Sequence, residues 1–194
     1  MPSILRASAC VLALTLAFIP SALRAATPDG GPPASEIIGK AEAQARAEHK
    51  AILIDFGASW CGNCKLYDRF LADPQMHAIL SRAFVFVTLT TGEHANDAKH
   101  TNTPGGVDFE DSIGGKSAGW PYLAILDANG KPIVDSFRPD PKAKGGKSNT
   151  GYPDSPEEVG WFVEMLRRSA PSLSSQDLAS VHAWLTTHST TQRH

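Results

Sequence analysis

Cysteine is scarce in this chain, with three residues among 194. A small domain held together by many disulfide bonds is therefore excluded, and a hydrophobic content of 42% indicates instead one soluble domain with its own core. Positive charge is not in excess either, because 18 Lys and Arg stand against 20 Asp and Glu. A chain without excess positive charge does not attract the phosphates of nucleic acid, so no nucleic-acid partner is expected.

Acidic residues are absent before Asp29. Arg6 is followed there by the apolar run "ACVLALTLAFIP" and then by small residues, which is typical of a secretory signal peptide. The pattern predicts a signal peptide over residues 1–25 and an exported protein, periplasmic if the source is bacterial. A retained membrane anchor is the alternative, but the break at Pro20 favours cleavage.

Cleavage would remove Cys10 and leave Cys61 and Cys64 as the only cysteines of a protein in an oxidising compartment. In "DFGASWCGNCK" they lie three positions apart, where a buried strand is expected to give way to a helix. Unpaired N–H groups at a helix start favour the thiolate of Cys61, which is expected to be the exposed nucleophile. Cys64, one turn further and shielded, is placed to attack a mixed disulfide at Cys61.

Zinc binding is a weaker interpretation of the two cysteines. Structural zinc takes four ligands, a second cysteine pair is missing, and the seven histidines lie away from the motif in the sequence. "GGKS" occurs twice without the first glycine of a phosphate-binding loop, so neither a nucleotide nor a metal is expected. Four further potential metal ligands in "EHANDAKH" are interpreted as part of a solvated loop: Glu93, His94, Asp97 and His100.

Helices and strands are predicted in alternation, which indicates an α/β fold with a mixed sheet. Two polar, glycine-rich segments, 91–119 and 138–154, are expected to be functional loops, the first with a short helix. Strands are expected at 51–57 and 84–90, both buried, and in a hairpin around Asn129-Gly130. Helices are expected over about 36–49 with Ser35 as cap, from the cysteines to Leu71 with a restart at Asp73-Pro74, from Ser155 onward, and over about 174–187.

Two segments, "LIDFGASWCGNCK" and "GWPYLAILDANGK", resemble the thioredoxin family, the second being similar to its cis-proline strand and turn. The resemblance extends over residues 36–187, leaving 26–35 as a linker and 188–194 as a tail. It is nearest to the exported branch that includes the C-terminal domain of the transmembrane thiol reductase. It implies a thioredoxin-like fold, a central mixed sheet flanked by helices, here with two long glycine-rich insertions.

The resemblance also implies roles for individual residues. Cys61 attacks, Cys64 resolves, and Asp55 is the buried acid that takes the proton of Cys64. Pro121 is the cis-proline that leaves the backbone of Trp120 free to pair with substrate, and Trp60 and Trp120 form an apolar rim. The alternatives are a structural, hydrogen-bonded role for Asp55 and ordinary packing for the two tryptophans.

The implied function is an exported thiol-disulfide oxidoreductase that reduces protein disulfides, with the Cys61–Cys64 couple and no other cofactor. An upstream thiol reductant protein, such as a membrane-embedded one, would recharge it, and a monomer is expected. Asn63 replaces the proline of thioredoxin, which leaves oxidant and isomerase open beside reductant. The alternative from another class is a non-catalytic binding module whose Cys61–Cys64 disulfide is structural.

Overall fold

Residues 31–190 are described by the structure, a computed structural model. The predicted signal peptide, residues 26–30 of the linker and residues 191–194 of the tail lie outside this range. In chain order the elements are α1 (Ala34–Glu48), β1 (Ala51–Gly57), α2 (Gly62–Ala72), α3 (Pro74–Leu80), β2 (Phe84–Thr90), α4 (Gly106–Ser112), β3 (Tyr122–Leu126), β4 (Pro132–Asp135), β5 (Phe137–Pro139), β6 (Lys147–Asn149), α5 (Pro156–Ser169) and α6 (Ser175–Thr187).

Four strands form the central sheet in the order β2-β1-β3-β4. β1 pairs with β2 in parallel and with β3 antiparallel, and β3 pairs antiparallel with β4. The predicted mixed sheet and the predicted hairpin are thus confirmed. In the register of the parallel pair, Asp55 of β1 lies opposite Thr88 of β2.

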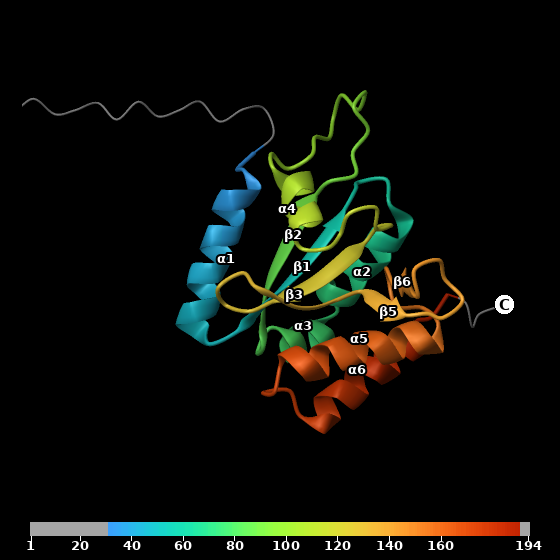
Figure 1. Cartoon of the computed structure of the whole chain (residues 1–194). Helices are drawn as coiled ribbons and strands as arrows, with labels where there is room; N and C mark the ends of the chain where they lie inside the picture. Colours follow the sequence, from blue (N-terminus) through green and yellow to red (C-terminus); the bar gives the residue numbers. More distant parts are fainter. Residues whose placement is uncertain (1–30, 191–194) are drawn as a thin grey trace, which may run out of the picture.

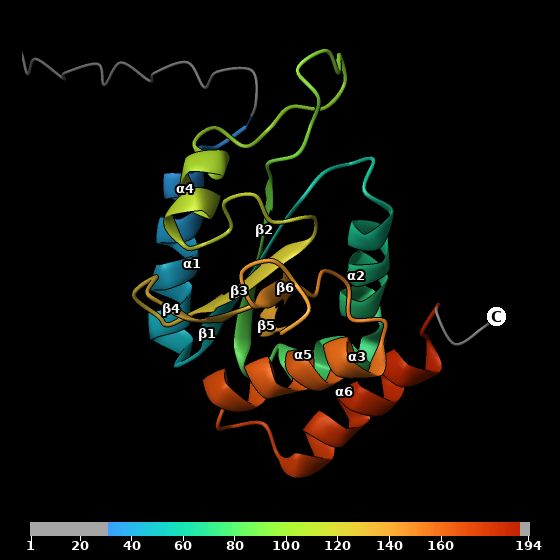
Figure 2. The ribbon, with the colours of Figure 1, turned by 45° about the vertical axis from the view of Figure 1, so that its right-hand side comes forward.

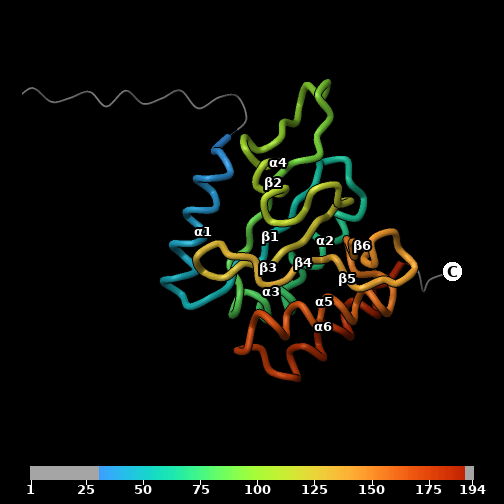
Figure 3. The backbone as a smooth tube through the Cα atoms, viewed as in Figure 1, coloured from blue at the N-terminus to red at the C-terminus, as the bar shows by residue number. Residues whose placement is uncertain are grey.

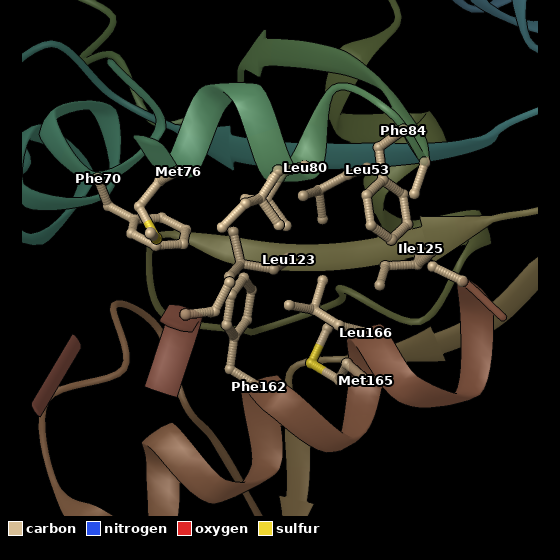
Figure 4. Close-up of a cluster of buried hydrophobic side chains, with 14 of the residues drawn as sticks. Leu53, Phe70, Met76, Leu80, Phe84, Leu123, Ile125, Phe162, Met165 and Leu166 are labelled. Carbon is tan, nitrogen blue, oxygen red and sulfur yellow. The ribbon is translucent and has the colours of Figure 1, made fainter. Parts of the chain in front are cut away.

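Successive residues of β1 enter two separate cores, because side chains alternate between the faces of a strand. Leu53 packs with residues of α2, α3, α5 and α6, among them Phe70, Leu80 and Phe162 (Figure 4). Ile54 faces the other side, toward α1 and the end of α4. Figure 1 shows the sheet between these two groups of helices. Asp55, one residue beyond Ile54, is therefore directed to the face that α2 covers.

Local signals set several helix starts as predicted. Pro74 opens α3, and Asp73 caps it by accepting hydrogen bonds from the backbone N–H groups of Gln75 and Met76. Ser155 caps α5 in a capping box. The predicted cap at Ser35 is wrong: Pro33 is the N-cap of α1, without a side-chain hydrogen bond.

Two further predictions need correction. The strand at 84–90 exists, but it is an edge strand whose Thr88 is exposed, because β2 has a neighbour only in β1. The 138–154 loop also contains structure, since β5 and β6 pair as a separate two-stranded ribbon. The longer 91–119 segment does carry the expected short helix, α4, and Figure 3 shows the chain between β2 and α4 projecting beyond the sheet.

From residue 31 to residue 190, no helix is both long enough and apolar enough to cross a membrane.

Candidate active site

Both cysteines lie at the start of α2, directly after the turn from β1. Cys61 is the N-cap residue, and its Sγ accepts a 3.1 Å hydrogen bond from the backbone N–H of Cys64. The two cysteines form a disulfide. Gly57 at the end of β1 allows this close packing, because a Cβ atom there would lie 2.9 Å from Cys64 Sγ. The sequence prediction of a cysteine pair at a strand-to-helix turn is confirmed.

The cysteines do not differ in exposure as expected. Cys61 is 5% exposed and Cys64 8%, and Ala58 and Trp120 pack against the pair. The prediction of an exposed Cys61 is therefore wrong for this disulfide form. The two sulfurs differ instead in their surroundings, because Cys61 lies at the positive end of the helix dipole while Cys64 borders a cavity.

This cavity, of about 310 Å³, lies between α2 and the sheet. Its lining includes Cys64, Asp55, Asp68, Thr88 and Glu93. It has room for several water molecules, each of which occupies roughly 30 Å³ in the liquid. A proton can therefore pass between Cys64 and the carboxyl groups through water without direct contact of the side chains.

Asp55 is 5% exposed, in agreement with the predicted position of a buried acid beneath the cysteines. Burial raises the pKa of Asp55 to about 7, because a carboxylate loses its hydration inside the protein. The hydroxyl of Thr88 donates a 2.9 Å hydrogen bond to Oδ1 of Asp55, which lowers the pKa in part. The nearby charge of Asp68 raises the pKa of Asp55 further. Asp55 thus changes charge near neutral pH, as a general base requires.

Two side chains beside Asp55 were missed by the sequence analysis. Asp68 lines the cavity one helical turn after Cys64, and partial burial raises its pKa. Tyr67 is wholly buried close to both acids, and among the described residues its hydroxyl has no hydrogen-bond partner. The four-residue spacing from Cys64 could have indicated Asp68, because such positions share one helix face.

Aromatic rings lie close to the disulfide, because Trp120 packs against the cysteines and Trp60 directly precedes Cys61 in the chain. Trp60 is 47% exposed, donates a 2.9 Å hydrogen bond from Nε1 to the carbonyl of Gly92, and meets Trp120 edge to face at 5.6 Å. His94 stacks on Trp60 with ring centroids 5.2 Å apart. The peptide bond between Trp120 and Pro121 is cis, as the resemblance implied. The two tryptophans are therefore in contact, and their role toward a substrate stays a prediction.

Glu93 holds the loop before the disulfide in place. Its carboxylate accepts hydrogen bonds from the backbone N–H and the hydroxyl of Ser59, and the N–H groups of Thr91 and Gly92 donate to the carbonyl of Gly57. The start of the 91–119 segment is thus attached to the turn that carries the cysteines. Sequence reasoning interpreted Glu93 as part of a solvated loop, but the residue is buried. Its contact with Ser59 was not predictable because the two residues lie 34 positions apart in the sequence.

Glu93, Asp97 and His100 bring potential metal-ligand atoms within 4.8 Å of one another, whereas His94 is not in this group. Glu93 already accepts hydrogen bonds from Ser59, and Asp97 accepts them from the backbone N–H groups of Lys99 and His100. We assign no ion to these residues. Among residues 31–190 the two cysteines belong to no such group.

Comparison with known proteins adds a family match. Residues 38–128 match the family described as thioredoxin-like. The predicted fold, an α/β thioredoxin-like fold with a mixed sheet flanked by helices, is confirmed by the sheet order and pairing described above and agrees with this match. No significant match is found among curated protein sequences.

Three solved structures illustrate the similarity. A disulphide isomerase from Xylella fastidiosa Temecula1 is 19% identical, with a TM-score of 0.46 over 90% of this chain and 99% of that one. A DsbH oxidoreductase is 18% identical, with a TM-score of 0.44 over 75% and 92%. A thiol:disulfide interchange protein from Chlorobium tepidum TLS is 23% identical, with a TM-score of 0.36 over 53% and 78%.

Proposed function

Because residues 38–128 belong to the thioredoxin-like family and Cys61 and Cys64 form a disulfide at the start of α2, we propose that the protein reduces disulfide bonds in other proteins. The observation that carries this proposal is the cavity that joins Cys64 to Asp55. A purely structural disulfide has no need of an acid that changes charge near pH 7 beside one of its sulfurs.

The reaction begins with both cysteines reduced. The thiolate of Cys61 attacks one sulfur of the substrate disulfide, a mixed disulfide forms, and one substrate thiolate leaves. Asp55 then accepts the proton of the Cys64 thiol through the cavity. The Cys64 thiolate attacks Cys61 Sγ, the Cys61–Cys64 disulfide forms, and the second substrate thiolate leaves and is protonated. Two electrons have passed to the substrate.

The substrate is a folded or partly folded protein whose chain lies against Trp60, Trp120 and the cis-proline Pro121. A dithiol protein upstream, such as a membrane-embedded one, reduces the Cys61–Cys64 disulfide after each turnover.

The protein acts as a monomer after export, in the periplasm if the source is bacterial, with residues 36–187 as its thioredoxin-like domain. Reduction is the proposed direction of exchange, and oxidation and isomerisation are the alternatives. The measurement that decides the direction is the reduction potential against glutathione.

Single replacements of the two cysteines test the mechanism. Cys61→Ser should abolish the reduction of insulin disulfides, because the nucleophile is gone. Cys64→Ser should accumulate mixed disulfides with its substrates, because no second thiol remains for a fast intramolecular exit. Non-reducing gels of the exported variants will show slower bands that collapse with dithiothreitol. The reverse pattern would exchange the two roles.

The alternative is a non-catalytic binding module with a locked disulfide. Thiol titration of the wild-type protein, with and without dithiothreitol, separates it from an enzyme. A redox couple gives two titratable thiols after mild reduction and returns to none on reoxidation. If the disulfide resists mild reductant, neither variant traps a partner and the wild-type protein leaves insulin intact, the binding module is correct.

A further inference from the structure

The β5–β6 ribbon is attached to the segment that carries the cis peptide bond. Nδ2 of Asn149, the last residue of β6, donates hydrogen bonds to the carbonyls of Gly119 (2.5 Å) and Pro121 (3.2 Å). These carbonyls lie on either side of Trp120. The backbone at Gly151 also lies close to this segment, because a Cβ atom at residue 151 would be 3.8 Å from the ring of Pro121. One amide side chain thus fixes the ribbon beside the strand end that would receive a substrate chain.

A buried serine connects the same amide to the sheet. The Ser136 hydroxyl donates to Oδ1 of Asn149 (2.6 Å) and accepts from the backbone N–H of Leu123 (3.0 Å). The backbone N–H of Ser136 donates to the carbonyl of Leu123, and that of Thr150 donates to the carbonyl of Ser136. Ser136 itself is fully buried. These hydrogen bonds consequently fix the position of the ribbon relative to β3.

The free end of this ribbon is positively charged. Lys142, Lys144 and Lys147 are exposed there, and within residues 31–190 none of the three takes part in a salt bridge. Asp140, the acid at this end, is occupied by Arg138 at 3.4 Å and by the hydroxyl of Ser148. The charges of Lys142, Lys144 and Lys147 are therefore not neutralised by an acid in a salt bridge, and Nζ of Lys147 lies 4.4 Å from the centroid of the Phe137 ring.

The lysine charges lie close enough to the segment with the cis Trp120–Pro121 peptide bond to act on a chain bound there. Each ribbon strand has three residues, so the turn that carries Lys142 and Lys144 begins about 10 Å from Asn149. This is about the distance over which charges act through 0.1 M salt. Figure 2 shows the ribbon in front of β3 and beside α2, the helix that begins at the cysteines.

We propose that the β5–β6 ribbon is a specificity element that docks an acidic segment flanking the disulfide of the partner protein. Asn149 positions the ribbon, and the three lysines recognise the acidic segment. This inference rests on the proposed disulfide exchange at Cys61 and Cys64, and it adds the chemical class of the partner.

Two synthetic peptides test the charge preference. They share one disulfide loop, which is flanked by glutamates in one peptide and by lysines in the other. At low ionic strength the wild-type protein should reduce the acidic peptide with a kcat/KM about tenfold higher, because opposite charges speed encounter. The preference should shrink in about 0.5 M salt, where charges are screened beyond a few ångströms.

Replacement of the lysines assigns the effect to the ribbon. The variant K142Q/K144Q should lower the acidic-to-basic ratio by about threefold or more. The matched control is K40Q/K131Q, which removes the same charge on α1 and the β3–β4 turn and should keep the ratio. Asn149→Asp keeps the size of the side chain but loses the donor to Gly119 and Pro121. It should raise KM for the acidic peptide while the reduction potential stays unchanged.

The outcomes separate this inference from the proposed function. If the wild-type protein reduces neither peptide and also fails to reduce the uncharged compound 2-hydroxyethyl disulfide, the oxidoreductase assignment is wrong. If it reduces that compound but treats both peptides alike, or if the control variant loses the preference as much as K142Q/K144Q, the ribbon inference is overturned.

Discussion

At the scale of single residues, Asp55 links the candidate mechanism to protein stability. In the unfolded chain an aspartate releases its proton near pH 4, whereas in the folded protein the pKa of Asp55 is about 7. Between these values the folded state holds a proton that the unfolded state has lost. The contribution of Asp55 to stability is therefore fully present below pH 4 and is lost as the pH rises to about 7.

Asp55→Asn should consequently stabilise the oxidised protein at pH 8, by roughly 2–4 kcal/mol, and have little effect at pH 4. The replacement keeps the shape and removes the buried charge. Urea unfolding at pH 4, 6 and 8 measures the difference. The same variant should slow disulfide reduction at neutral pH. A stability gain that did not depend on pH would remove the basis for a raised pKa.

Asp68 offers a second residue-scale prediction, now for activity. Its charge raises the pKa of Asp55, so Asp68→Asn should move the inflection of the pH–rate profile to lower pH. Asp55→Asn should instead remove the inflection. Glu157→Gln, an exposed acid at the start of α5, is the control and should leave the profile in place. Stopped-flow reduction of insulin from pH 5 to 9 provides the profiles, and an unmoved inflection in Asp68→Asn would contradict this role.

The site residues differ in how readily the sequence reveals them. Cys61 and Cys64 are recognisable because their chemistry depends on local spacing at a helix start. Asp68 was accessible in principle from the same helix face. Glu93 was not, because its contact with Ser59 forms only when the chain returns after β2. The equal burial of the cysteines likewise depends on Trp120, which is distant in the sequence.

At the scale of elements, the caps of two helices give a matched pair of variants. Asp73 accepts hydrogen bonds from two backbone N–H groups of α3, so Asp73→Ala should cost about 1 kcal/mol of stability. Ser35 lies inside α1 and caps nothing, so Ser35→Ala should be neutral or slightly stabilising. Thermal unfolding at pH 7 compares them. Equal losses in the two variants would disagree with the observed N-cap at Pro33.

Elements with strong local signals were predictable, and those that depend on partners were not. The apolar run 51–57 indicated β1, which is buried throughout. The edge position of β2 could not be read from its own apolar residues, because the order of strands is a tertiary property. The strands β5 and β6 were missed because Lys, Asn and Pro have low strand propensity, and pairing with each other and attachment through Asn149 stabilise them instead.

At the scale of the whole molecule, export is the prediction that the sequence alone carries. Its basic, apolar and small-residue regions in order predict a mature chain that starts at Ala26 or Thr27. Mass spectrometry of the protein from a secreting host should show the loss of residues 1–25 or 1–26. Leu14→Arg places a charge within the apolar run and should prevent processing. An intact N-terminus on the wild-type protein in the exported fraction would contradict the assignment.

The register of the ribbon also has a consequence for engineering. Phe137 pairs with Asn149 and Pro139 with Lys147, so the turn 140–146 is closed at its base by paired strands. New sequences of various lengths can be grafted between Pro139 and Lys147 while Ser136 and Asn149 keep their bonds. Under the proposed disulfide exchange, a library of such turns on one unchanged scaffold should change which target proteins are reduced.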